Sequence, residues 1–250
     1  MSLFSVEDRE RVHARVLALA EADDRVVAGA VVGSLALEGG DPWSDLDLTF
    51  AVADRTPVDA VLEDWSRTIV DELDAVHLFD LAAAAAIYRV FLLPGCLQLD
   101  LSFAPAHAWG AAGPKFRLLF GEAAPRGHAP PPDAKELLGY AVHHALRARF
   151  CIERGRLWQA EYWLSAMRDY ALDLACLHRG LPAREGRGFD QLPDEILDRF
   201  APTLVSSVRP QELRRALALA VAGLIAVAPE LDVRIERRLR TLVRDDSRVS

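Results

Sequence analysis

The chain has 250 residues, enough for one large domain or two small ones. Hydrophobic residues make up 51% and charged residues 26%, a composition typical of a globular protein rather than a disordered or fibrous one. The formal net charge of −8 argues against duplex nucleic acid as a partner, because such binding depends on lysine and arginine placed against phosphates.

Cysteine usage and hydropathy indicate the compartment. The three cysteines, Cys96, Cys151 and Cys176, are far apart and form no CxxC pair, so we expect them to be reduced and buried. The first residues lack the basic and apolar regions of a signal peptide. The longest apolar run, 216–228, is shorter than the roughly 20 residues of a membrane-spanning helix. These patterns predict a cytoplasmic protein without membrane contact.

Up to residue 122, the apolar spacing switches between helical and strand periods, which predicts a mixed sheet flanked by helices. Helices are expected over 6–22 and 57–73. Strands are expected over 25–32, 46–52, 76–81, 88–93 and 97–103, with a short apolar stretch at 116–120.

Residues 123–133 form the most Pro/Gly-rich segment, which predicts a linker between two domains. The residues that follow, 134–250, have helical spacing and predict an all-α helical bundle. Its helices are expected at about 133–153, 156–179, 193–203, 210–227 and 229–244. The predicted fold class is therefore α+β, with the sheet domain in 1–122 and the bundle after the linker.

The segment from Gly33 to Asp47 carries the chemistry; it reads Gly-Ser, ten residues, then Asp-Leu-Asp. A glycine at a strand end lets the backbone approach a phosphate, and Ser34 adds a hydroxyl donor. Asp45 and Asp47 lie two apart on a strand, so both carboxylates face one side and can bind a hard divalent cation. Asp100, a polar residue in an apolar strand, is expected to complete the group. Because neighbouring carboxylates repel one another, the group implies bound cations, and two Mg²⁺ ions fit it.

With Ser44 directly before Asp45, the segment resembles the signature of the DNA polymerase β-like nucleotidyltransferase superfamily, over about residues 10–120. The resemblance implies that Asp45, Asp47 and Asp100 bind the metal ions. It also implies that Gly33 and Ser34 hold the triphosphate of a nucleotide, with ATP the first candidate. Family loops often have glycine where this chain has Glu38, which leaves the path of the loop open.

The layout of the two domains resembles the aminoglycoside and lincosamide nucleotidyltransferases, which implies antibiotic resistance and a small-molecule acceptor bound by the helical domain. In some of these enzymes a glutamate of the helical domain is the general base. Here Glu161 is the candidate, Asp100 is the rival, and Arg168 could contact the nucleotide phosphates. Equally open is an interface helix in which Glu161 and Arg168 are paired or solvated. The polar and aromatic face in question comprises Trp158, Glu161, Ser165, Arg168 and Asp169.

Three functions compete on these observations. The first is magnesium-dependent transfer of a nucleoside monophosphate to a hydroxyl of a small molecule. The second is a protein-modifying nucleotidyltransferase of the antitoxin type, built on the same core. A binding module that has lost catalysis is the third, and the presence of all three acids argues against it. The sequence leaves the acceptor, the nucleotide and a homodimer open.

Overall fold

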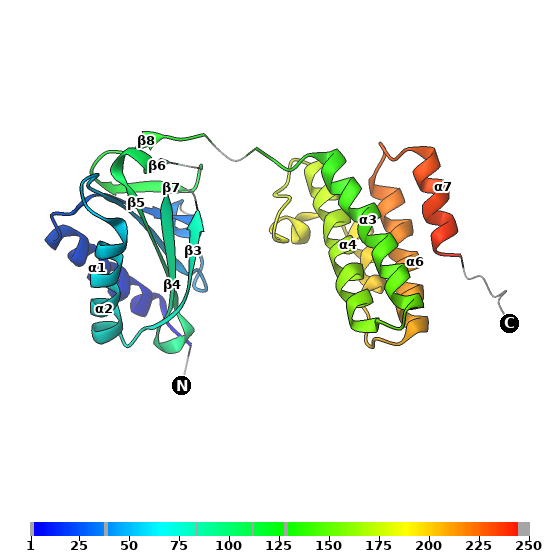
Figure 1. Cartoon of the computed structure of the whole chain (residues 1–250), viewed down its shortest axis with the longest axis horizontal. Helices are drawn as coiled ribbons and strands as arrows, with labels where there is room; N and C mark the ends of the chain where they lie inside the picture. The colour runs from blue at the N-terminus through cyan, green and yellow to red at the C-terminus, as the bar shows by residue number, and fades with distance from the viewer. Residues whose placement is uncertain (1–2, 38–39, 84, 112, 128–129, 245–250) are drawn as a thin grey trace. The chain divides into compact units, whose positions relative to one another are not determined.

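The computed structural model describes residues 3–37, 40–83, 85–111, 113–127 and 130–244. Glu38, where the path of the loop was left open, and residues 128–129 of the expected linker lie outside the described part. The chain forms two compact units, Met1–Ala129 and Pro130–Ser250, and the division between them falls within the 123–133 segment (Figure 1). We call them unit 1 and unit 2.

Unit 1 is built on a six-stranded sheet in the order β3-β4-β5-β2-β1-β7. Neighbours β2 and β5 run parallel and the other pairs run antiparallel, so the sheet is mixed, as expected. A separate two-residue pair joins β6 (Gly110–Ala111) to β8 (Ala124–Pro125). The six strands are β1 (Val26–Val32), β2 (Leu46–Val52), β3 (Val76–Ala83), β4 (Ala86–Leu92), β5 (Gln98–Pro105) and β7 (Phe116–Phe120).

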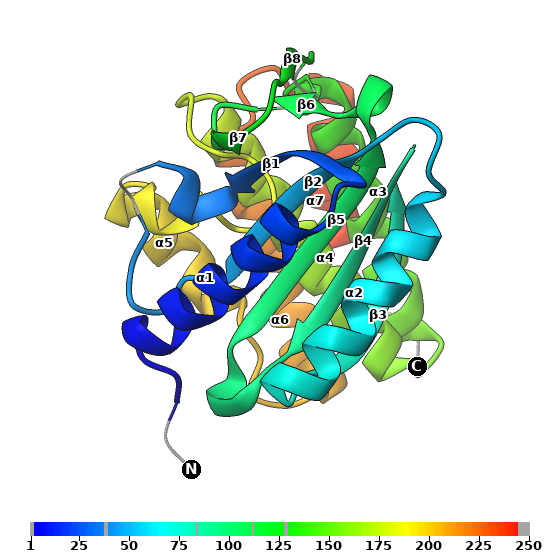
Figure 2. The ribbon, with the colours of Figure 1, turned by 90° about the vertical axis from the view of Figure 1, so that its left-hand side faces the viewer.

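Helices α1 (Val6–Ala22) and α2 (Val58–Leu73) lie across one face of this sheet (Figure 2). Alternate residues of β2 and β5 pack beneath them, and Trp65 of α2 lies 5.0 Å, centroid to centroid, from both Phe50 and Phe103. The residues between them, among them Asp47 and Asp100, therefore lie on the other face. The buried strand residues under the helices are Leu46, Leu48, Phe50, Leu99, Leu101 and Phe103.

Part of the other face is covered by the segment after β5. Trp109 is buried against small side chains of β1, β2 and β5, including Ala30 and Ala104. Its indole Nε1 donates to Thr49 Oγ1 at 2.9 Å, so the buried polar group is satisfied. This cover packs against the strand segments that follow Asp47 and Asp100 in the sequence.

Unit 2 is all-helical, which confirms the expected α+β class. Asp133 caps α3 by accepting from Lys135 N, and Gly155, at φ +68°, lies in the turn that joins α3 to α4. The helix expected over 193–203 is shorter than predicted and is followed by a 3₁₀ turn, and the last helix begins only at Val233. The helices are α3 (Ala134–Glu153), α4 (Leu157–Leu177), α5 (Asp194–Phe200), α6 (Pro210–Val227) and α7 (Val233–Leu242).

The described residues also show the state of the cysteines and the apolar character of the helices. All three cysteines are free; Cys151 and Cys176 are buried, but Cys96 is exposed, so its predicted burial was wrong. Cys96 lies in the β4–β5 turn at φ +63°, where its side chain points away from the core. Within the described part of the chain, no helix has the length and apolar character needed to cross a membrane.

Asp173 of α4 gives a test of the packing of unit 2. Its Oδ1 is buried with no hydrogen-bond partner among the described residues, and burial, with the Asp169 charge, raises its pKa from 3.8 to about 6. Because the pKa of Asp173 is higher in the folded state than in the unfolded state, its protonated form favours folding. This contribution to the free energy of unfolding is fully present below about pH 4 and is lost as the pH rises through about 6. We therefore expect Asp173→Asn to gain about 1–2 kcal/mol relative to wild type between pH 4 and pH 7, allowing for partial solvent screening.

Urea unfolding across this pH range measures the effect. The exposed Asp198→Asn on α5 is the matched control and should show no such pH-dependent gain. A difference between Asp173→Asn and wild type that stays constant from pH 4 to pH 7 would contradict the prediction.

Candidate active site

Three carboxylates meet where β2 and β5 begin. Asp47 and Asp100 are direct partners in the parallel register, and Asp45 lies one residue before β2. Each offers an oxygen within 4.8 Å of the others, and all three side chains are half-buried. The sheet thus brings together the three acids that the sequence singled out.

Gly33 and Ser34 lie beside this group, in a 3₁₀ turn, Gly33–Ala36, that follows β1. Gly33 has φ +72°, and a Cβ built on it would lie 2.1 Å from Asp47 Oδ2. Only glycine leaves room there for the carboxylate to lie against the backbone. The hydroxyl of Ser34 is buried and has no hydrogen-bond partner within the described residues. A buried hydroxyl in this condition favours a ligand oxygen nearby.

The turn before Asp45 is held from two sides. Asp41 N donates to Ser44 Oγ at 3.0 Å, and Trp43 N donates to Asp41 Oδ1 at 2.8 Å. From α1, the guanidinium of Arg9 donates to the carbonyl oxygens of Asp41 and Ser44, both at 2.8 Å. Arg9 is only 4% exposed, so this clamp is part of the core. It fixes the backbone from which Asp45 extends.

Asp100 is half-buried beside Gln98 and near Asp45. Burial raises its pKa, the hydrogen bonds from Gln98 act in the opposite direction, and the charge of Asp45 raises it further. Gln98 Nε2 donates to Oδ1 at 3.0 Å and to Oδ2 at 3.2 Å. Burial and repulsion both favour protonation of Asp100, and a divalent cation would reverse that preference by supplying positive charge.

The donor set fits magnesium. All three side chains offer carboxylate oxygens, the ligands that hard divalent cations prefer, and they extend from β2, from the residue before it and from β5. The Ser34 hydroxyl, which has no hydrogen-bond partner within the described residues, fits a phosphate oxygen beside the cation. The arrangement can therefore bind a metal and a polyphosphate together.

Glu161 and Arg168 belong to α4 of unit 2, where they join one hydrogen-bonded chain. Ser165 Oγ donates to Glu161 Oε1 at 2.5 Å and accepts from Arg168 Nη2 at 3.0 Å. Arg168 also reaches the carbonyl of Thr203 at 3.4 Å. The structure thus links Glu161 and Arg168 through Ser165. Trp158, near the start of the same helix, is 78% exposed.

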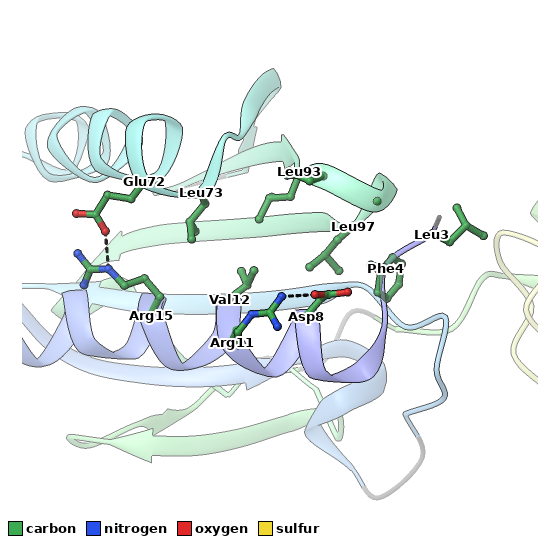
Figure 3. Close-up of a pocket in the computed structure, with 12 residues that line it drawn as sticks. Leu3, Phe4, Asp8, Arg11, Val12, Arg15, Glu72, Leu73, Leu93 and Leu97 are labelled. Atoms are coloured by element: carbon green, nitrogen blue, oxygen red, sulfur yellow. Dashed lines mark hydrogen bonds and ion pairs between the residues drawn. The ribbon is translucent and has the colours of Figure 1, made fainter. Parts of the chain in front are cut away.

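A cavity of about 630 Å³ lies on the helix side of unit 1 (Figure 3). Its apolar lining includes Val12, Leu93 and Leu97, and the ion pairs Arg11–Asp8 and Arg15–Glu72 line it as well. Leu97 directly precedes Gln98, whose side chain lies on the other face of β5. The cavity and the carboxylates are therefore on opposite faces of the sheet.

No family model and no curated protein sequence matches the chain. Among solved structures, it is similar to an aminoglycoside 6-adenyltransferase from Bacillus subtilis, with 13% identity and a TM-score of 0.41 over 91% of this chain and 94% of that one. It is also similar to a nucleotidyltransferase-like protein from Exiguobacterium sibiricum 255-15, with 12% identity and a TM-score of 0.37 over 92% and 77% of the two chains. Identities this low leave the chemistry to be judged from the residues of this chain.

Two residues at the site were missed in the sequence. Gln98 had a signal, because it lies two positions before Asp100 on a strand and so shares its face. Arg9 had none, because its contacts are 32 and 35 residues away and depend on how α1 packs.

Gly33→Ala tests the close approach of Gly33 to Asp47. The added methyl group would strain the positive φ and displace the Asp47 carboxylate. We expect the affinity for Mn²⁺, used in place of Mg²⁺ and measured by calorimetry, to fall about tenfold or more. Gly113→Ala is the control, since a Cβ there meets no atom within 4 Å. Equal Mn²⁺ affinities in the two variants would contradict this role.

Proposed function

We propose that the chain is a magnesium-dependent nucleotidyltransferase. It transfers a nucleoside monophosphate from a nucleoside triphosphate, ATP in the first instance, to a hydroxyl of a small molecule and releases pyrophosphate. The observation that carries the proposal is that Asp45, Asp47 and Asp100 bring carboxylate oxygens within 4.8 Å of one another where β2 and β5 begin. The turn at Gly33 and Ser34 lies beside these acids, and the Ser34 hydroxyl has no partner within the described residues. Both observations favour a triphosphate bound next to the metal ions.

Each residue has a separate task in this reaction. Asp45, Asp47 and Asp100 would hold two Mg²⁺ ions, and these would supply Lewis acidity for the attacking hydroxyl and positive charge for the leaving pyrophosphate. Ser34 donates to a phosphate oxygen, and Gly33 lets that phosphate approach the backbone. The acceptor oxygen forms a bond to the α-phosphorus, and the bond from that phosphorus to pyrophosphate breaks. The hydroxyl proton goes to a carboxylate, for which Asp100 and Glu161 are the candidates.

For the acceptor we propose an aminoglycoside or lincosamide antibiotic, bound with the help of unit 2. The support is the order of a sheet unit followed by a helical unit, together with the polar face of α4. Arg168 is proposed to assist with the nucleotide phosphates. A protein acceptor is the alternative, and the same assay separates the two.

Pyrophosphate release from ATP and Mg²⁺, measured with aminoglycosides, lincosamides and purified proteins as acceptors, tests the function. Asp47→Asn should lower the rate by about 10³-fold or more, because a ligand charge is lost with little change in volume. The exposed Asp71→Asn on α2 is the matched control and should retain the wild-type rate. Failure of every acceptor, with no Mg²⁺-dependent nucleotide binding, would refute the proposal.

Glu161→Gln distinguishes the two candidate bases. Glutamine keeps an oxygen that can accept from Ser165 but cannot take up a proton. If Glu161 is the base, kcat should fall by about 10²-fold or more while Mn²⁺ affinity stays unchanged. A rate within threefold of wild type would remove Glu161 from this role and leave Asp100.

A further inference from the structure

Gln98 stands out among the polar groups around the carboxylates, because its side-chain amide nitrogen donates to both oxygens of one acid. The distances from Nε2 are 3.0 Å to Asp100 Oδ1 and 3.2 Å to Asp100 Oδ2. Both side chains are half-buried and lie two residues apart on β5, so they share the face that carries the other two acids. We propose that Gln98 is a positioning residue that aims the Asp100 carboxylate at the metal ions.

The strand register places Gln98 directly beside the charged group. β2 and β5 pair Leu46 with Leu99 and Asp47 with Asp100. Continuing this parallel register by one residue sets Asp45 beside Gln98. Gln98 is therefore the fourth member of a quartet in which the other three side chains are acids, and it lies next to one acid while holding another.

A neutral donor suits this place better than a cation. An arginine or lysine at this position would orient Asp100 equally well, but it would neutralise the carboxylate and compete with the metal. The amide of Gln98 fixes the direction of Asp100 and leaves its full negative charge for Mg²⁺. Partners of this kind, which hold a ligand without touching the metal, typically change metal affinity by about 10–100-fold.

The contact of Gln98 with both oxygens of Asp100 is also compatible with metal binding by Asp100. Each Asp100 oxygen is within hydrogen-bond distance of the same nitrogen. When one oxygen turns to a cation, the other can keep the Gln98 hydrogen bond without movement of the strand. The Asp100 carboxylate is then oriented both before and after the metal binds, which reduces the entropy lost on binding.

Gln98→Met in the full chain tests the inference, which rests on the proposed metal site. Methionine has nearly the shape of glutamine and no N–H donor. We expect Mn²⁺ affinity, measured by calorimetry without nucleotide, to fall about 10–100-fold. In the pyrophosphate assay the Mg²⁺ concentration for half-maximal rate should rise by the same factor, while the rate at saturating Mg²⁺ stays within threefold of wild type. Gln211→Met, exposed on α6, is the matched control.

The outcomes separate this inference from the function on which it rests. Wild-type Mn²⁺ affinity in Gln98→Met, or a lost rate that excess Mg²⁺ does not restore, overturns the role of Gln98 alone. Absence of Mn²⁺ binding by wild type overturns the metal site and the role of Gln98 together. Gln98→Asn is the second variant if Gln98→Met fails to fold. Its side chain is one methylene shorter and cannot reach both oxygens, so it should weaken Mn²⁺ binding by a similar factor.

Discussion

The three carboxylates of unit 1 repel one another, and the packing of the surrounding strands and helices must hold them together against this repulsion. Asp45, Asp47 and Asp100 hold oxygens within 4.8 Å of one another, where like charges disfavour the ionised forms. Strands free to shift would relieve this by moving apart. β2 and β5 cannot do so, because their other faces are packed with buried residues such as Phe50 and Phe103 under α1 and α2. The hydrophobic core thus holds the charges together.

The polar groups that support this cluster leave its charge intact. Gln98 is neutral, and the Ser34 hydroxyl is neutral and still without a partner in the described part of the chain. Arg9, the buried cation nearby, donates to backbone carbonyls of the turn before Asp45. Its guanidinium fixes the turn through hydrogen bonds to these two carbonyls. The site therefore combines rigid geometry with a negative charge available to a cation.

Local patterns were enough to predict much of this site. Alternation over 46–52 and 97–103 placed Asp47 and Asp100 on strands and Asp45 directly before the first of them, because a strand with one buried face has a period of two. The register that pairs Asp47 directly with Asp100 could not be predicted, because it depends on how two distant strands align. The same holds for Arg9, whose contacts arise only when α1 packs on the sheet. Cys96 was misjudged because composition favours buried cysteine, whereas its backbone lies in an exposed turn.

On the polar face of α4, helical spacing predicted which residues could contact one another but did not predict the hydrogen bonds that they form. The i, i+4 spacing put Glu161 and Ser165 within reach of each other, and the structure orders the chain from Arg168 through Ser165 to Glu161. The hydrogen bond from Ser165 is accepted by Oε1 of Glu161, and a carboxylate has further lone pairs with which to accept a proton. Arg168 is more constrained, since its side chain is 15% exposed and its two terminal nitrogens bond to Ser165 and Thr203. A phosphate contact by Arg168 would require this side chain to release the carbonyl of Thr203, whereas proton uptake by Glu161 would leave the hydrogen bond from Ser165 in place.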